Sequence, residues 1–252
     1  YPSAGTVARA RDKIHCKQVW REAGLPTPAA EVGHSPAAAL RMLHAVRGPI
    51  VIKPLSGSGS ELIFVCHDRH DCIEAITTLQ LQLAAHRNTR MYPPDPAGAF
   101  AMEEFVSGRE YSADFIVEPD QLRIIRIARK YFASGQPVGT TLAYAVPAEL
   151  PGELDRARFT DQLYRAARSL GISRAICMVD FIVRREQAMI LELTPRPGGD
   201  CLPRLIKHCC GIDMLQLALD FAERRPIDIS EPSQWHKLAA VPLIAPRGGV
   251  LR

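Results

Sequence analysis

Residues 175–194 read AICMVDFIVRREQAMILELT and contain two strand-like runs, Ala175–Arg184 and Ala188–Thr194. Both runs are rich in apolar and β-branched residues, and the charged residues between them are typical of a turn, so the pattern predicts a β-hairpin. If the turn is centred on Glu186, Asp180 and Glu192 lie equally far from it and face each other across the strands. Directly opposed side chains lie about 5 Å apart, and like charges there are destabilising unless something bridges them.

A divalent cation is the natural bridge between the two carboxylates. Mg²⁺ prefers oxygen ligands and commonly shares its remaining positions with water and phosphate. Thr194 is expected on the same face of the hairpin and is a candidate third ligand. Met178, Ile182 and Ile190 are also expected on this face. These apolar neighbours favour a sheltered metal site over the alternative, a solvated hairpin face.

The segment Thr194–Asp200, TPRPGGD, follows the hairpin and leads into a helix. Arg196 could hold a carboxylate or a phosphate in its planar guanidinium fork. Alternatively, it is a surface arginine in a turn.

The segment Lys53–Ser60, KPLSGSGS, places a lysine at the end of a strand before a loop of alternating Ser and Gly. Glycines allow backbone N–H groups to converge on an anion, and the ammonium adds a charge suited to phosphate. Neither the P-loop pattern nor the Rossmann glycine pattern is present. A flexible hairpin turn is the alternative interpretation.

The segment Cys66–Cys72, CHDRHDC, is dense in potential zinc ligands, but it lies where a strand gives way to a helix. There Asp68 is a good N-cap and Asp71 complements the helix dipole, so a structural role is favoured. His208, Cys209 and Cys210 are adjacent on a helix and point to different faces, which favours core packing.

Along the rest of the chain, helices and strands are predicted to alternate. Helices are expected at Arg11–Gly24, Ala37–Val46, Cys72–His86, Leu154–Leu170, Leu202–Cys210 and Met214–Glu223. Further strands are expected at Pro49–Lys53, Glu61–Cys66, Phe100–Val106, Tyr111–Val117 and Leu122–Ala128. The short turn Glu118–Asp120 implies antiparallel pairing of the last two strands. Arg87–Gly98 has the composition of a linker or crossing loop.

The composition is that of an ordinary globular protein, with 252 residues, 47% of them apolar and 23% charged. The net charge of +4 is too weak and too dispersed to indicate nucleic-acid binding. No apolar run is long enough to cross a membrane, and no signal peptide is recognisable. Seven cysteines without a C-x-x-C spacing are typical of reduced thiols, so a cytoplasmic protein is expected.

The order of these motifs, together with the segment Glu103–Ser112, EEFVSGREYS, resembles the ATP-grasp superfamily from about Asp12 to about Glu223. Within it, the chain is most similar to carboxylate–amine ligases, including L-amino acid ligases and relatives of carbamoyl phosphate synthetase and biotin carboxylase. The resemblance implies an α+β fold in which two lobes clasp ATP, with a mainly antiparallel sheet in the C-terminal lobe.

The resemblance also implies roles for particular residues. Contacts with ATP are expected from Lys13, Lys53, Ser56, Gly57, Ser58, Gly59, Ser60, Glu103, Glu104, Val106 and Glu110. Among these, backbone groups of Glu104 and Val106 would read adenine, and Glu110 would hold the ribose hydroxyls. Mg²⁺, or Mn²⁺ as an alternative, would be bound by Asp180, Glu192 and Thr194. Arg196 would steady the acid substrate or its acyl phosphate, and Lys130 is a further candidate for the reacting phosphate.

Two features depart from the family pattern. The metal strand of the family usually reads Glu-x-Asn, whereas this chain has Glu192-Leu193-Thr194, with a hydroxyl in place of the amide. The family also usually carries an N-terminal α/β domain before the first lysine helix. That domain is expected as a missing partner, and the chain is expected to be a fragment or a separate domain.

The predicted organisation is an N-terminal lobe at 1–102, a C-terminal lobe at 103–230 and a tail, or the start of a truncated region, at 231–252. The expected activity is ATP-dependent activation of a small-molecule carboxylate for attack by an amine, with amino acid or dipeptide-type substrates. A nucleotide-binding or regulatory module without turnover and an ATP-grasp kinase are the alternatives. Neither a nucleic-acid nor a membrane partner is expected.

Overall fold

The computed structural model describes residues 1–56, 62–85, 97–132, 139–152, 154–229 and 234–241. Its helices are α1 (Ala4–Arg11), α2 (Lys13–Glu22), α3 (Pro36–Val46), α4 (Arg69–Ala85), α5 (Arg156–Ser169), α6 (Leu202–Cys210) and α7 (Met214–Ala222). Its strands are β1 (Ala30–Gly33), β2 (Ile50–Lys53), β3 (Phe64–Cys66), β4 (Phe100–Glu104), β5 (Arg109–Glu118), β6 (Gln121–Phe132), β7 (Thr141–Val146), β8 (Ala175–Arg184), β9 (Gln187–Thr194) and β10 (Leu238–Ala240). No helix within these described residues is long and apolar enough to cross a membrane.

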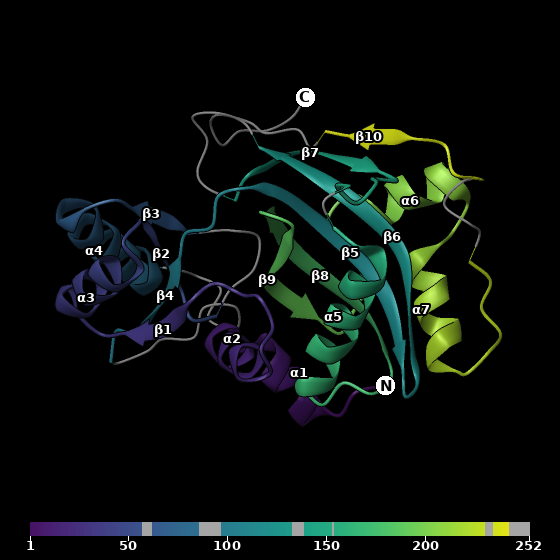
Figure 1. The fold of residues 1–252 in the computed structure, drawn as a ribbon, viewed down its shortest axis with the longest axis horizontal. Coiled ribbons are helices and arrows are strands. Elements are labelled where there is room, and N and C mark those ends of the chain that lie inside the picture. The colour runs from purple at the N-terminus through teal and green to yellow at the C-terminus, as the bar shows by residue number, and fades with distance from the viewer. Residues whose placement is uncertain (57–61, 86–96, 133–138, 153, 230–233, 242–252) are drawn as a thin grey trace.

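The smaller sheet has the strand order β1-β4-β2-β3, and its pairs are antiparallel. Alternate residues of β2 and β4 are buried against α3 and α4, among them Ile50, Ile52, Phe100 and Met102. The residues between them, including Lys53 and Glu103, point to the opposite face because side chains alternate along a strand. This small lobe lies at the left of Figure 1.

The larger sheet has the order β10-β7-β6-β5-β8-β9, and its pairs are also antiparallel. One face forms a core with α5 and the first two helices, in which Phe159 of α5 and Trp20 of α2 are buried with Phe181 of β8. On the other face, α6 and α7 cover Ile125, Val146 and other residues from one part of the sheet (Figure 1). The rest of that face carries charged side chains from β5, β6, β8 and β9.

These observations confirm the predicted α+β class, with a mainly antiparallel C-terminal sheet. The helix expected at Arg11–Gly24 is present as α2, which begins after Asp12, because Asp12 caps it by accepting hydrogen bonds from the N–H groups of Ile14 and His15. Helix α1, which precedes it, was not predicted. The short strands β1, β7 and β10 were not predicted, and β6 is longer than expected.

The structure also bears on the predicted organisation. Helix α1, although placed before residue 102, packs against β9 of the larger sheet, and α2 contacts both that strand and β1 of the smaller sheet. The division into lobes at 102 therefore stays a prediction. Most of the expected linker Arg87–Gly98 lies outside the described residues, as does most of the segment 231–252.

Candidate functional site

The β8–β9 hairpin places the two predicted metal ligands opposite each other. Asp180 pairs with Glu192, and Met178 pairs with Thr194, as the predicted register requires. Between β8 and β9, the turn consists of Arg185 and Glu186, which both have positive φ. Asp180 and Glu192 are half-buried, so they lie on a sheltered part of the sheet.

The predicted face of Ile190 is wrong. Beyond Asp180 the register shifts by one residue, and Phe181 pairs with Ile190. This bulge places the extra residue Leu191 in β9 and turns Ile190 to the opposite face, where it is fully buried in the core. Met189 pairs with Ile182 instead. A single extra residue in one strand reverses the facing of the residues beyond it.

The bulge is held by a buried lysine that was not predicted from the sequence. Lys17 of α2 donates a hydrogen bond from Nζ to the carbonyl of Leu191 at 2.7 Å. The same Nζ lies 2.9 Å from Oε1 of Glu103, and its side chain is 1% exposed. Lys17 therefore joins strand β4 of the small lobe to the residue that precedes Glu192.

Glu103 also binds Lys53, whose Nζ lies 2.8 Å from the same Oε1 atom. Burial acts to raise the pKa of Glu103, but Lys17 and Lys53 outweigh it and lower that pKa to about 2. Burial lowers the pKa of Lys17, and Glu103 opposes this effect. Two cations thus share one buried carboxylate, which holds Lys53 in place and leaves the group with more cations than carboxylates, as an anion site requires.

A second charged cluster lies on the large sheet. Nζ of Lys130 is 2.5 Å from Oε1 of Glu110 and 3.3 Å from Oδ2 of Asp180. Burial lowers the pKa of Lys130, but Asp180 and Glu110 together raise it above its ordinary value. Burial raises the pKa of Glu110, assisted by Asp180 and opposed by Lys130. Lys130 therefore stays cationic beside the predicted metal ligand.

The donor set around Asp180 and Glu192 fits a hard cation. Carboxylate oxygens are the ligands that Mg²⁺ prefers, and two of them are opposed here. Within the described residues, Oγ1 of Thr194 is buried and has no hydrogen-bond partner, so an additional oxygen acceptor is available on the same face. The described part of the chain contains no group of three His, Cys, Asp or Glu residues arranged for a metal. Water and phosphate would therefore complete the coordination.

The remaining nucleotide-contact candidates lie in α2, at the end of β4 and just beyond it, and after β2. Burial lowers the pKa of Lys13, while Glu192 acts to raise it. The backbone N–H of Glu104 donates to the carbonyl of Ala29 at 2.8 Å, so that donor is already used, and its carboxylate binds Arg184 at 3.1 Å. Val106 is buried just beyond β4. Ser56 is described, whereas Gly57, Ser58, Gly59 and Ser60 lie outside the described residues.

Arg196 is exposed, and its Nη1 donates to the carbonyl of Pro197 at 2.8 Å. The loop that carries it is anchored where the N–H of Gly198 donates to Oδ1 of Asp114 at 2.9 Å. Asp114 is itself paired with buried Arg126 at 2.8 Å. A Cβ atom at Gly198 would lie 2.6 Å from Nη2 of Arg126, so the buried pair requires glycine there.

Three buried charged residues were not predicted from the sequence: Lys17, Asp114 and Arg126. For Lys17, a usable signal was its position four residues after Lys13, because residues four apart lie on one side of a helix. Asp114 and Arg126 are charged residues inside otherwise apolar strand runs, which also signals a buried pair.

The cysteine- and histidine-rich segment has the local structure expected of a helix start. The N–H of Asp71 donates to Asp68, and Asp71 accepts from the N–H of His67. Cys66 and Cys72 are buried, and burial raises the pKa of both thiols. These interactions agree with a structural role for the segment.

Comparison with known proteins identifies the family. A family model described as the ATP-grasp domain matches residues 46–204. A D-alanine–D-alanine ligase of Desulforudis audaxviator is 31% identical over 208 residues, covering 79% of this chain and 63% of the relative. A D-alanine–D-alanine ligase of Delftia acidovorans is 27% identical over 255 residues, covering 94% of this chain and 71% of the relative.

Among solved structures, an L-amino acid ligase from Bacillus licheniformis is similar with a TM-score of 0.67 and 21% identity. That match covers 92% of this chain and 52% of the ligase, so the chain spans only about half of this neighbour. At this identity, the similarity shows a shared fold. The match of the family model across more than half of the sequence shows that the chain belongs to the ATP-grasp family, in the superfamily of carboxylate–amine ligases.

Proposed function

We propose that this chain forms the nucleotide-binding and phosphoryl-transfer part of an ATP-dependent carboxylate–amine ligase. The observation that carries the proposal is the pairing of Asp180 with Glu192 on the uncovered part of the large sheet, beside Lys130. Lys17 connects this region to the Glu103–Lys53 pair of the small lobe. Two lobes therefore contribute opposite charges to one place, as binding of a metal-complexed triphosphate requires.

In the proposed reaction, an oxygen of the carboxylate substrate attacks the γ-phosphorus of ATP, and ADP leaves. The amine nitrogen then attacks the carbon of the resulting acyl phosphate and loses a proton, and inorganic phosphate leaves. Phosphoryl transfer depends mainly on positioning and on neutralising the phosphate oxygens. In our assignment, Lys13, Lys53 and Lys130 provide that positive charge.

The other predicted residues have positioning roles in this proposal. Glu103 holds Lys53, while Glu110 binds the ribose hydroxyls. The carbonyl of Glu104 and the backbone of Val106 contact adenine, and the segment Ser56–Ser60 covers the phosphates. Arg196, which is exposed, is available for the carboxylate of the acid substrate.

Mg²⁺ would be held by Asp180, Glu192 and Thr194, where it would supply positive charge to the triphosphate oxygens. Amino acids are the proposed substrate class, because the named relatives include D-alanine–D-alanine ligases and a structural neighbour is an L-amino acid ligase. An additional N-terminal α/β domain is proposed as a partner for complete substrate binding.

A direct test measures ADP release with ATP, Mg²⁺ and a mixture of amino acids, followed by product mass. A product joined through a C–N bond supports the ligase, whereas a phosphorylated hydroxyl would identify a kinase. ATP binding without ADP release, with the proposed partner domain supplied, would identify a silent nucleotide-binding module.

The metal assignment predicts opposite effects of Glu192→Gln with and without ligand. Without Mg²⁺ and ATP, removing one of two opposed charges should leave stability unchanged or slightly higher. With Mg²⁺ and ATP, the variant should lose most of the rise in thermal midpoint that the parent shows. Asp180→Asn should behave similarly, because Glu110 still pairs with Lys130.

Thermal unfolding of each variant with and without Mg²⁺ and ATP checks this prediction. Asp120→Asn is the matched control, since it removes one exposed charge in the β5–β6 turn and should keep the full ligand-induced rise. A Glu192→Gln variant that is strongly destabilised without ligand, yet still responds like the parent, would contradict the metal assignment.

A further inference from the structure

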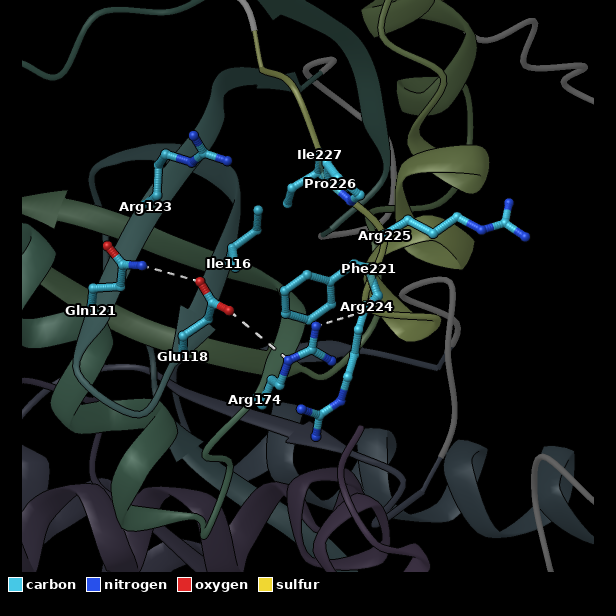
Figure 2. A pocket seen from close by; sticks show the side chains of 10 residues that line it. All are labelled: Ile116, Glu118, Gln121, Arg123, Arg174, Phe221, Arg224, Arg225, Pro226 and Ile227. Carbon is cyan, nitrogen blue, oxygen red and sulfur yellow. Dashed lines mark hydrogen bonds and ion pairs between the residues drawn. The ribbon is translucent and has the colours of Figure 1, made fainter.

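A cavity of about 440 Å³ lies at the end of the large sheet where the β5–β6 hairpin turns (Figure 2). Its walls come from three segments that are far apart in sequence: the end of this hairpin, Arg174 before β8, and residues 221–227 at the end of α7. Its volume lies within the range typical of sites for small molecules, about 300 to 1,000 Å³. The tertiary fold alone brings these segments together.

The cavity is rich in positive charge. Its lining includes four arginines and one carboxylate, and these residues are Arg123, Arg174, Arg224, Arg225 and Glu118. Arg225 is already paired with Asp220 and Glu223, and in Figure 2 its side chain points away from the other lining residues. Within the described part of the chain, Arg123 and Arg224 have no ion-pair partner. The lining therefore has an excess of positive charge that an anion would neutralise.

Arg174 is anchored by two contacts with Phe221. Its Nη2 donates to the carbonyl of Phe221 at 2.7 Å, and its Cζ lies 3.8 Å from the centre of the Phe221 ring. Its Nε lies 4.0 Å from Oε1 of Glu118, which is too long for a hydrogen bond. A guanidinium has five N–H donors, so this anchored group retains donors for a ligand. A pre-positioned fork of this kind suits the oxygens of phosphate.

The remaining lining residues are Gln121 and four apolar residues, Ile116, Phe221, Pro226 and Ile227. Ile116 and Phe221 are only 3% and 2% exposed, so the apolar surface open to a ligand comes mainly from Pro226 and Ile227. A bare inorganic ion would leave this apolar surface without a partner. An anion attached to a small apolar or aromatic body would use both parts of the lining.

We propose that this cavity binds a small phosphate ester, with the dianionic phosphate facing Arg174 and Arg224, Arg123 adding positive charge from across the cavity, and the organic body on Pro226 and Ile227. A dianion matches the excess charge better than a single carboxylate does. This site is separate from the proposed active site. Arg123 and Lys130 are seven residues apart on β6, which at about 3.3 Å per residue corresponds to roughly 20 Å.

The test is calorimetric titration of the full chain with phenyl phosphate at low ionic strength, since salt screens such contacts. The parent should bind it, and benzoate, with one charge, should bind at least tenfold more weakly. The double variant Arg123→Ala with Arg224→Ala should lose at least tenfold in affinity. Arg41→Ala, which removes an exposed arginine of α3, should stay within twofold of the parent.

Lys53→Ala distinguishes this site from the proposed nucleotide site and should leave phenyl phosphate binding within twofold. The proposal would be overturned if the parent did not bind phenyl phosphate. It would also be overturned if Lys53→Ala lost phenyl phosphate binding while the double variant kept it.

If the double variant unfolds, Arg123→Lys with Arg224→Lys keeps the charge without the guanidinium fork and should weaken phenyl phosphate binding measurably. NMR of the parent gives an independent check, because the methyl signals of Ile116 and Ile227 should shift during the titration, and unmoved signals would overturn the assignment.

Discussion

At the scale of single residues, the most consequential interaction is the one that Glu103 makes with two lysines. Its Oε1 lies within 3 Å of both Lys17 and Lys53, and the three side chains are largely buried. Burying charges is costly, so removing one partner from such a group leaves an uncompensated charge and costs more than an exposed ion pair contributes. The lowered pKa of Glu103 means that the folded state favours its ionised form.

We therefore predict that Glu103→Gln lowers the free energy of unfolding at pH 7 by about 3 kcal/mol. Because the pKa of Glu103 falls from 4.5 to about 2 on folding, its contribution is complete above about pH 4.5 and is lost as pH falls toward 2. The difference between parent and variant should therefore shrink over that interval. Urea denaturation at a series of pH values measures this difference.

Glu104→Gln is the matched control for this experiment. Glu104 pairs with Arg184, but the two side chains are 28% and 41% exposed, so the expected loss is at most about 1 kcal/mol. Equal losses in the two variants, or a Glu103→Gln effect that does not change with pH, would contradict the buried-pair interpretation.

At the scale of secondary-structure elements, the β8–β9 hairpin determines the geometry of the site. Its two-residue turn, Arg185 and Glu186, has φ values of 48° and 61°, which are typical of a type I′ turn. The bulge at Leu191 then shifts the register so that Asp180 faces Glu192. The turn and the bulge together decide which side chains of β9 reach the charged face.

Both turn residues adopt a left-handed conformation that disfavours side chains with a Cβ atom. We predict that Glu186→Gly raises the free energy of unfolding by about 0.5 to 1 kcal/mol, because glycine removes this strain and favours the same turn. Urea denaturation measures the change. Gln187→Gly, one residue further in β9, should instead destabilise the protein, since glycine weakens a strand. A loss of stability in Glu186→Gly would contradict the assignment of the turn.

At the scale of the whole molecule, the first lobe is joined to the second through contacts with β9. Oγ1 of Thr27 donates to the carbonyl of Ile190 at 2.8 Å, and Thr27 is buried. Lys17 donates to Leu191, the next residue of the same strand. The N-terminal segment therefore holds the strand that carries Glu192.

We predict that Thr27→Val lowers the free energy of unfolding by about 1 to 3 kcal/mol, because it leaves a buried carbonyl of β9 without this donor. Thr77→Val is the matched control, since Thr77 is exposed and donates to Ile73 within its own helix. The control should change stability by less than about 0.5 kcal/mol. Chemical denaturation of both variants checks the prediction, which equal effects in the two variants would contradict.

Much of the site geometry was predictable from local patterns. Alternating apolar residues and a short charged turn predicted the β8–β9 hairpin, and the expected pairing of Asp180 with Glu192 is confirmed. That pairing nevertheless arises differently from the prediction. The turn is centred between Arg185 and Glu186 instead of on Glu186, which by itself would place Asp180 opposite Leu191. The bulge at Leu191 shifts the pairing by one residue and so places Asp180 opposite Glu192. Ile190 was misplaced for the same reason, because periodicity does not reveal a bulge.

Local sequence thus determined the α+β class, the hairpin and the presence of a carboxylate pair, because side-chain alternation and turn composition act over a few residues. Only the tertiary structure decided that Lys17 reaches Glu103 and that four arginines line one cavity. These groups come from elements that are distant in sequence. Their burial and charge pairing depend on how the sheets and helices pack, which no local pattern specifies.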